Sequence, residues 1–130
     1  MGIKPGGRAI LIDAPPDAIT AIDLPELTIA QKLTGQFDYI HFFALKHTQL
    51  EAKLDQLRKH LKHTGMLWIS WPKARKLGTD LTLPHLIQIG YSHTLIESKA
   101  LSINDTWSAL KFTHPRKGKV YKNRFGQQIE

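Results

Sequence analysis

Short apolar runs alternate with amphipathic stretches along this chain, and the alternation predicts an α/β protein. The runs are too short for helices, are rich in aromatic and β-branched residues, and are bounded by turn-forming residues, which favours strands. Six strands are predicted, at residues 8–13, 27–30, 37–45, 65–72, 98–103 and 107–113. The second strand is the weakest and is expected at or near an edge of the sheet. The last two are joined by three residues, too few for a crossover helix, so this pair must be antiparallel.

Helical periodicity is clearest between the third and fourth strands. Four leucines fall on one face at helical spacing, namely Leu50, Leu54, Leu57 and Leu61. Thr48 and Glu51 have the spacing of a capping box, and Gly65 is placed to end the helix in the left-handed conformation. Shorter helices are expected at residues 16–22, where Pro is tolerated in the first turn, and at residues 82–90.

The resulting order of elements is strand, helix, strand, strand, helix, strand, helix, strand, strand, which indicates parallel pairing with right-handed crossovers. This order resembles a shortened methyltransferase-type Rossmann fold, an α/β architecture of three layers whose mostly parallel sheet ends in an antiparallel hairpin. Most of the chain takes part in the resemblance. Residues 1–114 are expected to form this single domain, followed by a basic C-terminal tail at residues 115–130.

The charge of the chain is distributed unevenly. The net charge is +7; residues 1–56 carry five Lys or Arg and seven Asp or Glu, whereas residues 57–130 carry 13 and four. A basic half of this kind suggests a polyanionic partner such as nucleic acid, although a solvated surface explains it equally simply. The cations that a nucleic acid would contact are Arg75, Lys76, Arg116, Lys117, Lys119, Lys122 and Arg124.

Several classes of protein are excluded or disfavoured by composition. The chain has no Cys, which excludes disulfides, thiolate metal sites and cysteine nucleophiles. It has no signal-peptide pattern and no apolar run of membrane-spanning length, so we expect a cytoplasmic protein without a membrane partner. His60 and His63 have metal-compatible spacing on the expected helix, but no carboxylate shares their face, and we predict no metal site.

The turn after the first strand disfavours a nucleotide-like cofactor. A dinucleotide or S-adenosylmethionine site needs glycine there, so that the backbone can approach the ligand closely. Residues 13–17 read Asp-Ala-Pro-Pro-Asp, with no glycine and with two prolines that lack amide donors. Residues 30–32 also lack the acidic side chain that would hold ribose hydroxyls. We therefore expect no cofactor, with S-adenosylmethionine possible but disfavoured.

The carboxyl edge of the sheet is the expected binding site, because open α/β sheets place ligands there, at the point where strand order reverses. The segments that meet at this edge are residues 13–17, 46–47 and 71–80, with the hairpin turn at 105–107. The predicted ligand-binding residues are Asp13, Lys46, His47, Trp71, Lys73, Thr79, Asp80, Asp105 and Trp107. Cations among these segments favour an anionic small molecule.

Each candidate side chain also has a structural explanation. Asp80 is placed to cap a helix, and Asp105 to close the hairpin turn. Trp107 could stack a base or cover the edge of the sheet. His47 could act as a base or pack before the helix, and His41 is expected to be a hydrogen-bonded core residue.

Four segments resemble an uncharacterised bacterial family, domain of unknown function 3052. They are Gly2-Ile3-Lys4-Pro5-Gly6, Trp71-Pro72-Lys73, Thr79-Asp80-Leu81-Thr82 and Asp105-Thr106-Trp107-Ser108-Ala109-Leu110-Lys111-Phe112. The resemblance covers residues 2–114, with departures at Asn104 and Ala109. It implies a small cytoplasmic bacterial protein with a Rossmann-like fold, and it implies no particular activity. It also marks six candidate residues as a shared constellation: Trp71, Lys73, Thr79, Asp80, Asp105 and Trp107.

These observations favour a non-catalytic, Rossmann-like binding module for an anionic ligand, with a degenerate S-adenosylmethionine site. One alternative is a nucleic-acid-associated protein that uses its basic half. Another is a divergent methyltransferase in which Asp13 or Asp17 replaces the usual residues. A scaffold subunit that acts only through protein contacts is not separable from the first hypothesis by sequence.

Overall fold

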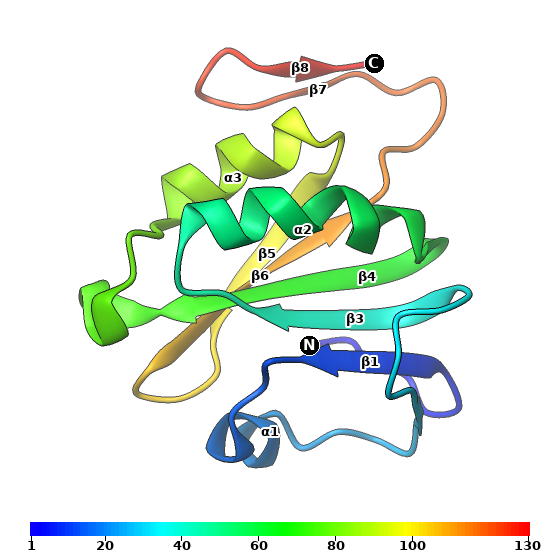
Figure 1. Ribbon diagram of the computed structural model, residues 1–130. Coiled ribbons are helices and arrows are strands. Elements are labelled where there is room, and N and C mark those ends of the chain that lie inside the picture. Colours follow the sequence, from blue (N-terminus) through cyan, green and yellow to red (C-terminus); the bar gives the residue numbers. More distant parts are fainter.

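The computed structural model describes residues 1–130 and confirms the predicted order of strands and helices (Figure 1). The elements are β1 (Arg8–Ile12), α1 (Pro16–Ile22), β2 (Thr28–Ile29), β3 (Phe37–Phe43), α2 (His47–Lys59), β4 (Leu61–Pro72), α3 (Leu83–Ser92), β5 (Ile96–Ser102), β6 (Trp107–Thr113), β7 (Tyr121–Lys122) and β8 (Gln128–Ile129). An irregular turn, η1 (Lys73–Gly78), follows β4.

Six strands form one sheet in the order β2-β1-β3-β4-β6-β5. The first four of these strands are parallel to one another, while β6 runs antiparallel between β4 and β5. The strand order reverses at β1, which has β2 on one side and β3 on the other, as expected for the switch point. This arrangement confirms the Rossmann-like fold with a terminal antiparallel pair.

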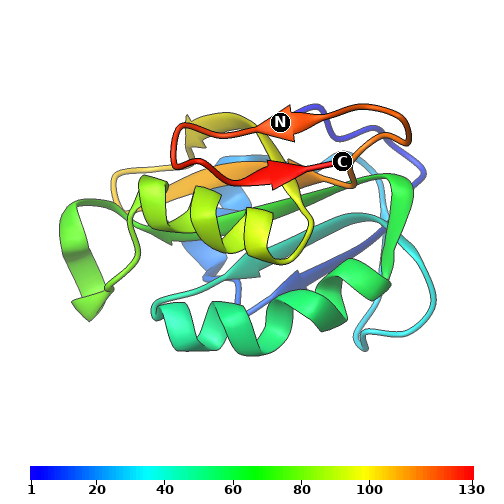
Figure 2. The same ribbon diagram turned by 90° about the horizontal axis from the view of Figure 1, so that it is seen from above.

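The two faces of the sheet are covered differently. Helices α2 and α3 lie on one face, and α1 and the N-terminal segment lie on the other (Figures 1 and 2). Alternation along β3 follows this division: Ile40 and Phe42 pack into the large core under α2 and α3, whereas Tyr39 packs with Met1 and Ile3 on the opposite face. Both faces of β3 are therefore buried, which explains its nearly continuous apolar sequence.

The expected end of the long helix was wrong. Helix α2 ends at Lys59, and β4 begins at Leu61, so that Gly65 lies within the strand. Pairing with β3 prevails over helix propensity here, because Phe37 donates its amide to the carbonyl of His60 and pairs with Leu61. A Cβ at Gly65 would lie 2.9 Å from the Phe37 carbonyl oxygen, so the close strand pairing itself requires glycine.

This correction also separates the two histidines considered as metal ligands. His60 is the C-terminal cap of α2, and His63 lies on β4. His63 instead has its ring centroid 5.1 Å from that of His114. The spacing of three residues therefore does not place both imidazoles on one helical face.

Helix boundaries differ in two further places. Helix α2 starts two residues earlier than the Thr48–Glu51 pattern predicted, because Lys46 is the N-cap and the side-chain carbonyl of Gln49 accepts its amide at 3.0 Å. Helix α3 continues two residues past Gly90, which is inside the helix rather than at its end. The Phe112 ring occupies the space beside Gly90, where a Cβ would lie 2.2 Å from it.

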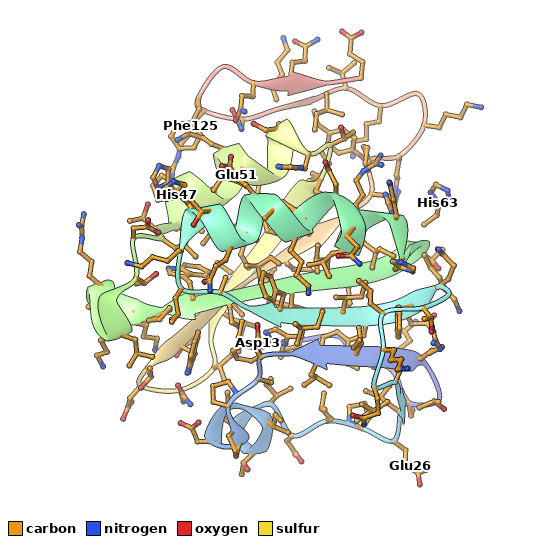
Figure 3. All side chains as sticks on the ribbon, in the orientation of Figure 1. Asp13, Glu26, His47, Glu51, His63 and Phe125 are labelled. Carbon is orange, nitrogen blue, oxygen red and sulfur yellow. The ribbon has the colours of Figure 1, made fainter.

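The C-terminal tail folds back onto α3 as a β7–β8 hairpin, with Phe125 in its turn (Figures 1 and 3). Ile129 is buried in the large core. The Gln127 side-chain amide donates to the Gln88 carbonyl at 3.1 Å and to the Ser92 hydroxyl at 3.2 Å. The tail sequence has no apolar periodicity, so these contacts of Ile129 and Gln127 could not be predicted from it. The division at residue 114 stays a prediction.

Candidate functional site

The carboxyl ends of β1, β3 and β4 meet the β5–β6 turn at one edge of the sheet (Figure 1). The Lys73 amide donates to the Thr106 carbonyl at 2.7 Å, which joins the end of β4 to that turn. Figure 3 shows Asp13 at the end of β1 and His47 at the start of α2. The topology thus brings the predicted segments to the same edge, and the contacts among them decide what each side chain does.

Thr79 and Asp80 brace the segment before α3 against the start of α2. The Thr79 hydroxyl donates to the Leu45 carbonyl, and the Asp80 amide donates to the same oxygen at 3.3 Å. The Asp80 carboxylate accepts the His47 amide at 2.8 Å and lies 2.7 Å from His47 Nδ1. The His47 amide is the main reason that the pKa of Asp80 lies below its ordinary value. Asp80 therefore caps α2 across 33 residues of sequence.

Three lysines of the predicted site also make internal hydrogen bonds. Lys46 donates its ammonium to the Gly78 carbonyl at 2.5 Å, and Lys76 donates to the Asp105 carbonyl at 2.9 Å. Lys73 donates to the Ser102 hydroxyl. Arg75 is exposed and makes no side-chain hydrogen bond or ion pair. Most of the cationic side chains at this edge thus link loops to one another.

These links hold a strained turn. Ala74, Arg75 and Leu77 have φ values of 50°, 59° and 55°, in the left-handed region that residues with a Cβ adopt only at a cost of about 1–2 kcal/mol each. Lys73 and Lys76, within the same turn, tie it to the β5–β6 hairpin. In this conformation the turn leaves the Leu77 side chain 60% exposed to solvent.

A small pocket lies beneath Leu77, with a volume of about 260 Å³. Its lining consists of Asp13, Phe43, Leu45, Gln49, Leu77 and Trp107. The Phe43 and Trp107 rings meet edge to face, with centroids 5.1 Å apart. Asp13 is exposed and has φ of 58°, so β1 ends in a left-handed bend at the rim of the pocket.

Two of the nine predicted residues, Asp13 and Trp107, line this pocket. Trp71 is instead 7% exposed and packs in the large core. The side chain of Asp105 makes no hydrogen bond, and Asn104 closes the hairpin turn by accepting the amides of Thr106 and Trp107 at 2.9 Å. Sequence reasoning did not name Phe43, Leu45, Gln49 or Leu77 as ligand-binding residues, although Leu77 lies within the predicted segment 71–80. Their position at or soon after the carboxyl ends of β3 and β4 was the available signal, and three of the four are apolar.

Three buried polar side chains link β3 to β4 on the face of the sheet opposite α2 and α3. The Tyr39 hydroxyl lies 2.5 Å from His41 Nδ1, and His41 Nε2 lies 2.6 Å from the Ser70 hydroxyl. All three residues are buried, and burial lowers the pKa of His41 to about 3. The expectation that His41 is a hydrogen-bonded core residue is confirmed.

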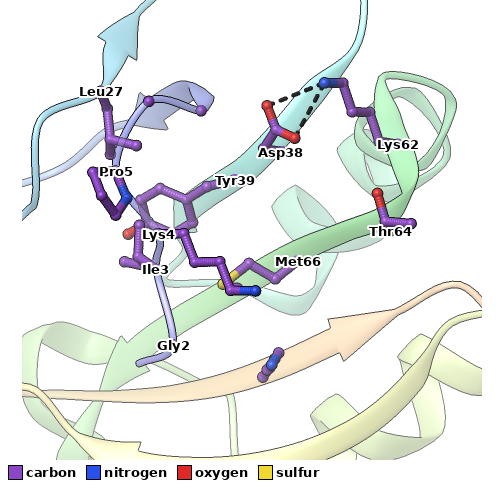
Figure 4. Close-up of a pocket in the computed structure, with 13 residues that line it drawn as sticks. Gly2, Ile3, Lys4, Pro5, Leu27, Asp38, Tyr39, Lys62, Thr64 and Met66 are labelled. Atoms are coloured by element: carbon purple, nitrogen blue, oxygen red, sulfur yellow. Dashed lines mark hydrogen bonds and ion pairs between the residues drawn. The ribbon is translucent and has the colours of Figure 1, made fainter.

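The larger hollow of the molecule lies at the opposite, amino edge of the sheet, with a volume of about 660 Å³ (Figure 4). It was not predicted from the sequence. Elsewhere, no three His, Asp or Glu side chains are grouped in a way that could hold a metal ion. None of the helices has both the length and the apolar character needed to cross a membrane.

No protein-family model and no curated protein matches the sequence. Solved structures, in contrast, share its fold. A ribosomal protein L11 methylase from Lactobacillus delbrueckii is 14% identical, with a TM-score of 0.56 over 88% of this chain and 73% of its own. A TehB-like methyltransferase dependent on S-adenosylmethionine, from Corynebacterium glutamicum, is 13% identical, with a TM-score of 0.55 over 86% and 82%.

A magnesium protoporphyrin IX methyltransferase from Synechocystis, solved with bound S-adenosylmethionine, is 12% identical, with a TM-score of 0.56 over 85% of this chain and 71% of its own. Identities this low establish the fold and leave the chemistry of the site open. The chain has the methyltransferase-like Rossmann fold.

Proposed function

We propose that this chain is a non-catalytic, Rossmann-like binding module whose ligand occupies the pocket at the carboxyl edge. The observation that carries the proposal is the turn after β1. In it, Pro15 and Pro16 replace the glycines that adenosyl and dinucleotide ligands require, and the pocket above it holds only about 260 Å³. Pockets for drug-sized ligands are typically about 300–1,000 Å³, so the geometry favours a smaller molecule.

The backbone at this turn supports the view that S-adenosylmethionine does not fit. Pro15 and Pro16 have no N–H group. Of the first amides of α1, those of Ala18 and Ile19 both donate to the Pro15 carbonyl at 3.1 Å, and only that of Asp17 makes no backbone hydrogen bond. Few amides are therefore left for a ligand. Strand β2 ends at Ile29 and is followed by Ala30-Gln31-Lys32, so no carboxylate stands where ribose hydroxyls would be bound.

The lining of the pocket suggests the chemistry of its ligand. Four apolar side chains, two of them aromatic, form its walls, and Asp13 supplies an acceptor at the rim. We expect a small molecule with an apolar face and a hydrogen-bond donor. The anionic ligand expected from the sequence has less support, since Lys46, Lys73 and Lys76 each donate to oxygens of the chain itself.

A thermal-shift screen of small amines and alcohols that carry an apolar group, run beside nucleotides, phosphorylated metabolites and S-adenosylmethionine, tests the proposal. A ligand of this pocket should raise the melting temperature, and Asp13→Asn should abolish that rise. Asp17→Asn is the matched control, because Asp17 is exposed and lies outside the pocket. A saturable response to S-adenosylmethionine that is lost in Asp13→Asn and kept in Asp17→Asn would instead support the divergent methyltransferase, with Asp13 in place of the usual residues.

Association with nucleic acid is a second candidate function, favoured by the folded tail. Residues 106–129 contain six Lys or Arg and no Asp or Glu. The tail forms a two-stranded ribbon, which is one of the shapes that enters a major groove. Phe125 is 37% exposed in its turn, with the Arg124 guanidinium 5.2 Å from the ring centroid, an arrangement that can stack a base.

Binding of this kind should weaken steeply as salt is raised, because phosphate contacts release counterions. Replacing Lys122 and Arg124 by Gln should reduce the slope of log affinity against log salt by about two. The control replaces Lys32 and Lys53, which changes the net charge equally outside the tail. If gel shifts show no complex at low salt, or both double variants lose affinity equally, the tail is not the contact surface.

Two other expectations stay predictions. Membership of domain of unknown function 3052 depends on the four sequence segments that resemble it. A cytoplasmic location depends on the absence of a recognisable targeting pattern.

A further inference from the structure

We propose that the hollow at the amino edge of the sheet is a second binding site, for an anionic small molecule that also carries an apolar group. We call it the amino-edge pocket; Lys4, Lys62, Lys111, Tyr39, Thr64 and Met66 are its principal lining residues. At about 660 Å³ it falls within the usual range for small-molecule sites, unlike the pocket at the carboxyl edge. The amino-edge pocket shares no lining residue with the pocket of the proposed function.

The pocket forms because the second face of the sheet is incompletely covered. Helix α1 packs near the carboxyl ends of the strands, through Ala18 beside Phe43 and Trp107. Toward the amino ends of the strands, the N-terminal segment replaces a helix, and residues 2–7 form one wall of the hollow (Figure 4). Gly2 and Gly6 have φ values of 76° and 85°, which allow this segment to turn over the sheet.

The charge within the pocket is not balanced by the protein. Asp38, its only acid, accepts the Arg8 amide at 2.8 Å and the Lys62 ammonium at 3.1 and 3.2 Å (Figure 4). Lys62 and Asp38 therefore neutralise each other. Lys4 and Lys111 make no side-chain hydrogen bond or ion pair, which leaves two positive charges facing the same hollow.

A third lysine increases this imbalance from the neighbouring strand. Lys99 of β5 pairs directly with Lys111 of β6. Residues directly opposite in an antiparallel pair project from the same face, and like charges placed so destabilise the sheet. The second face also carries Trp107 and Ala109 of β6, so Lys111 projects toward the pocket and away from α3. A bound anion would relieve the repulsion between the two strands.

Apolar side chains form the floor beside these charges. Tyr39 lies beneath the pocket, buried, with its hydroxyl directed to His41, and the half-buried Ile3 and Leu27 line the pocket above the sheet. Met66 is half-buried and accepts a hydrogen bond from the Trp68 indole at 3.2 Å. The Thr64 hydroxyl makes no hydrogen bond within the chain and is exposed. The lining thus combines free cations, a free hydroxyl and an apolar surface.

Titration of the ¹⁵N-labelled full chain with phenyl phosphate, and separately with inorganic phosphate, tests the assignment. We expect saturable amide shifts at Gly6, Thr64 and Lys111, and tighter binding of phenyl phosphate, because its ring can cover the half-buried Met66 and Ile3. Lys4→Gln and Lys111→Gln should each weaken phenyl phosphate at least tenfold, as loss of a charge-assisted hydrogen bond implies. Lys32→Gln, which removes the same charge from an exposed loop, should change affinity less than twofold.

The melting temperature of each variant without ligand shows whether weaker binding results from a loss of structure. Without ligand, Lys111→Gln should melt at the same temperature as wild type or higher, because it removes the repulsion from Lys99. Asp13→Asn should bind phenyl phosphate normally, which separates this site from the one at the carboxyl edge. Linear, unsaturable shifts, or equal weakening by Lys32→Gln, would overturn the proposal and indicate general attraction of anions to a basic protein.

Discussion

His41 shows how one buried side chain can join polar groups on two neighbouring strands that are otherwise apolar. Its two ring nitrogens face the Tyr39 and Ser70 hydroxyls, and none of the three groups reaches solvent. A satisfied network of this kind fixes the register of β3 against β4, because a slip of one residue would leave each group unpaired. Burial raises the pKa of Tyr39 and lowers that of His41, so both side chains stay neutral near pH 7.

The depressed pKa of His41 predicts a dependence of stability on pH. An unfolded histidine titrates near 6.5, whereas the folded His41 titrates near 3. The unfolded state alone takes up a proton between these values, so the contribution is complete above about pH 6.5 and falls as pH drops toward 3. Urea unfolding from pH 7.5 to 5.0 should show a loss approaching ~1 kcal/mol per pH unit.

His41→Gln removes this titration and should flatten the pH profile, whatever it does to absolute stability. His85→Gln, at an exposed position, should leave the profile unchanged. Parallel profiles for wild type and His41→Gln would contradict the assignment.

Asp80 joins two segments of the carboxyl edge, because its hydrogen bonds connect the residues before α3 to the start of α2. Its pKa is lowered mainly by the His47 amide, so it stabilises the folded state above the ordinary Asp pKa of about 3.9 and loses this effect as pH falls below that value. Asp80→Ala should lower the melting temperature at pH 7, with the difference narrowing below about pH 4. Asp105→Ala, which removes a carboxylate without a hydrogen bond, should have a smaller effect at pH 7.

At the scale of elements, packing between α3 and the sheet overrides helix propensity. Gly90 lies within the last turn of α3, and glycine inside a helix costs about 1 kcal/mol relative to alanine. A Cβ at this position would lie 2.2 and 2.9 Å from two atoms of the Phe112 ring on β6. The glycine is therefore explained by the close approach of a strand residue, and helix termination has no part in it.

Gly90→Ala should accordingly lower the free energy of unfolding by about 1–3 kcal/mol, the usual effect of overpacking, despite its better propensity. Phe112→Leu should be less harmful in the Gly90→Ala background than in wild type, because the smaller side chain makes room for the methyl group. A double-mutant cycle by urea denaturation measures this coupling. Effects that add within about 0.5 kcal/mol would show that the two positions do not share one space.

At the scale of the whole molecule, two termini complete the fold. The N-terminal segment covers part of the second face of the sheet, and the C-terminal hairpin covers α3 (Figures 1 and 2). The binding surfaces follow from these additions: a small pocket at the carboxyl edge, a larger one under the N-terminal segment, and a basic ribbon at the C-terminus. Each surface uses a different part of the chain, so each can be removed without the others.

Ile129 is expected to attach the hairpin to the domain. It is 8% exposed within the large core, so Ile129→Ala should lower the free energy of unfolding by about 2 kcal/mol, at the lower end of the range for buried isoleucine because a terminal hairpin can adjust. Val120→Ala, at a position 54% exposed, should have almost no effect. Amide exchange of the hairpin should accelerate only in Ile129→Ala; unchanged protection there would mean that Gln127 alone holds the tail.

Local patterns were sufficient to predict the strands, the order of elements and the switch point. The run at residues 37–45 and the repeated leucines of α2 are strong periodic signals, and parallel crossovers have one usual hand. Helix ends were less predictable, because Gly65 and Gly90 have the sequence signature of helix termination while their roles depend on Phe37 and Phe112. Contacts across 20 or more residues of sequence leave no mark in a local window.

The sequence by itself determined which segments become strands and helices, that no glycine follows the first strand, and that positive charge collects in the second half. These properties depend on local backbone preference and composition, which are complete in the chain. Only the tertiary structure decided that Lys46, Lys73 and Lys76 donate hydrogen bonds to neighbouring loops, and that Asp80 caps a distant helix. It also placed Lys4 and Lys111 in one pocket whose single acid, Asp38, is paired with Lys62. Such roles depend on which atoms come within hydrogen-bonding or Coulombic range, and that is settled only when the chain has folded.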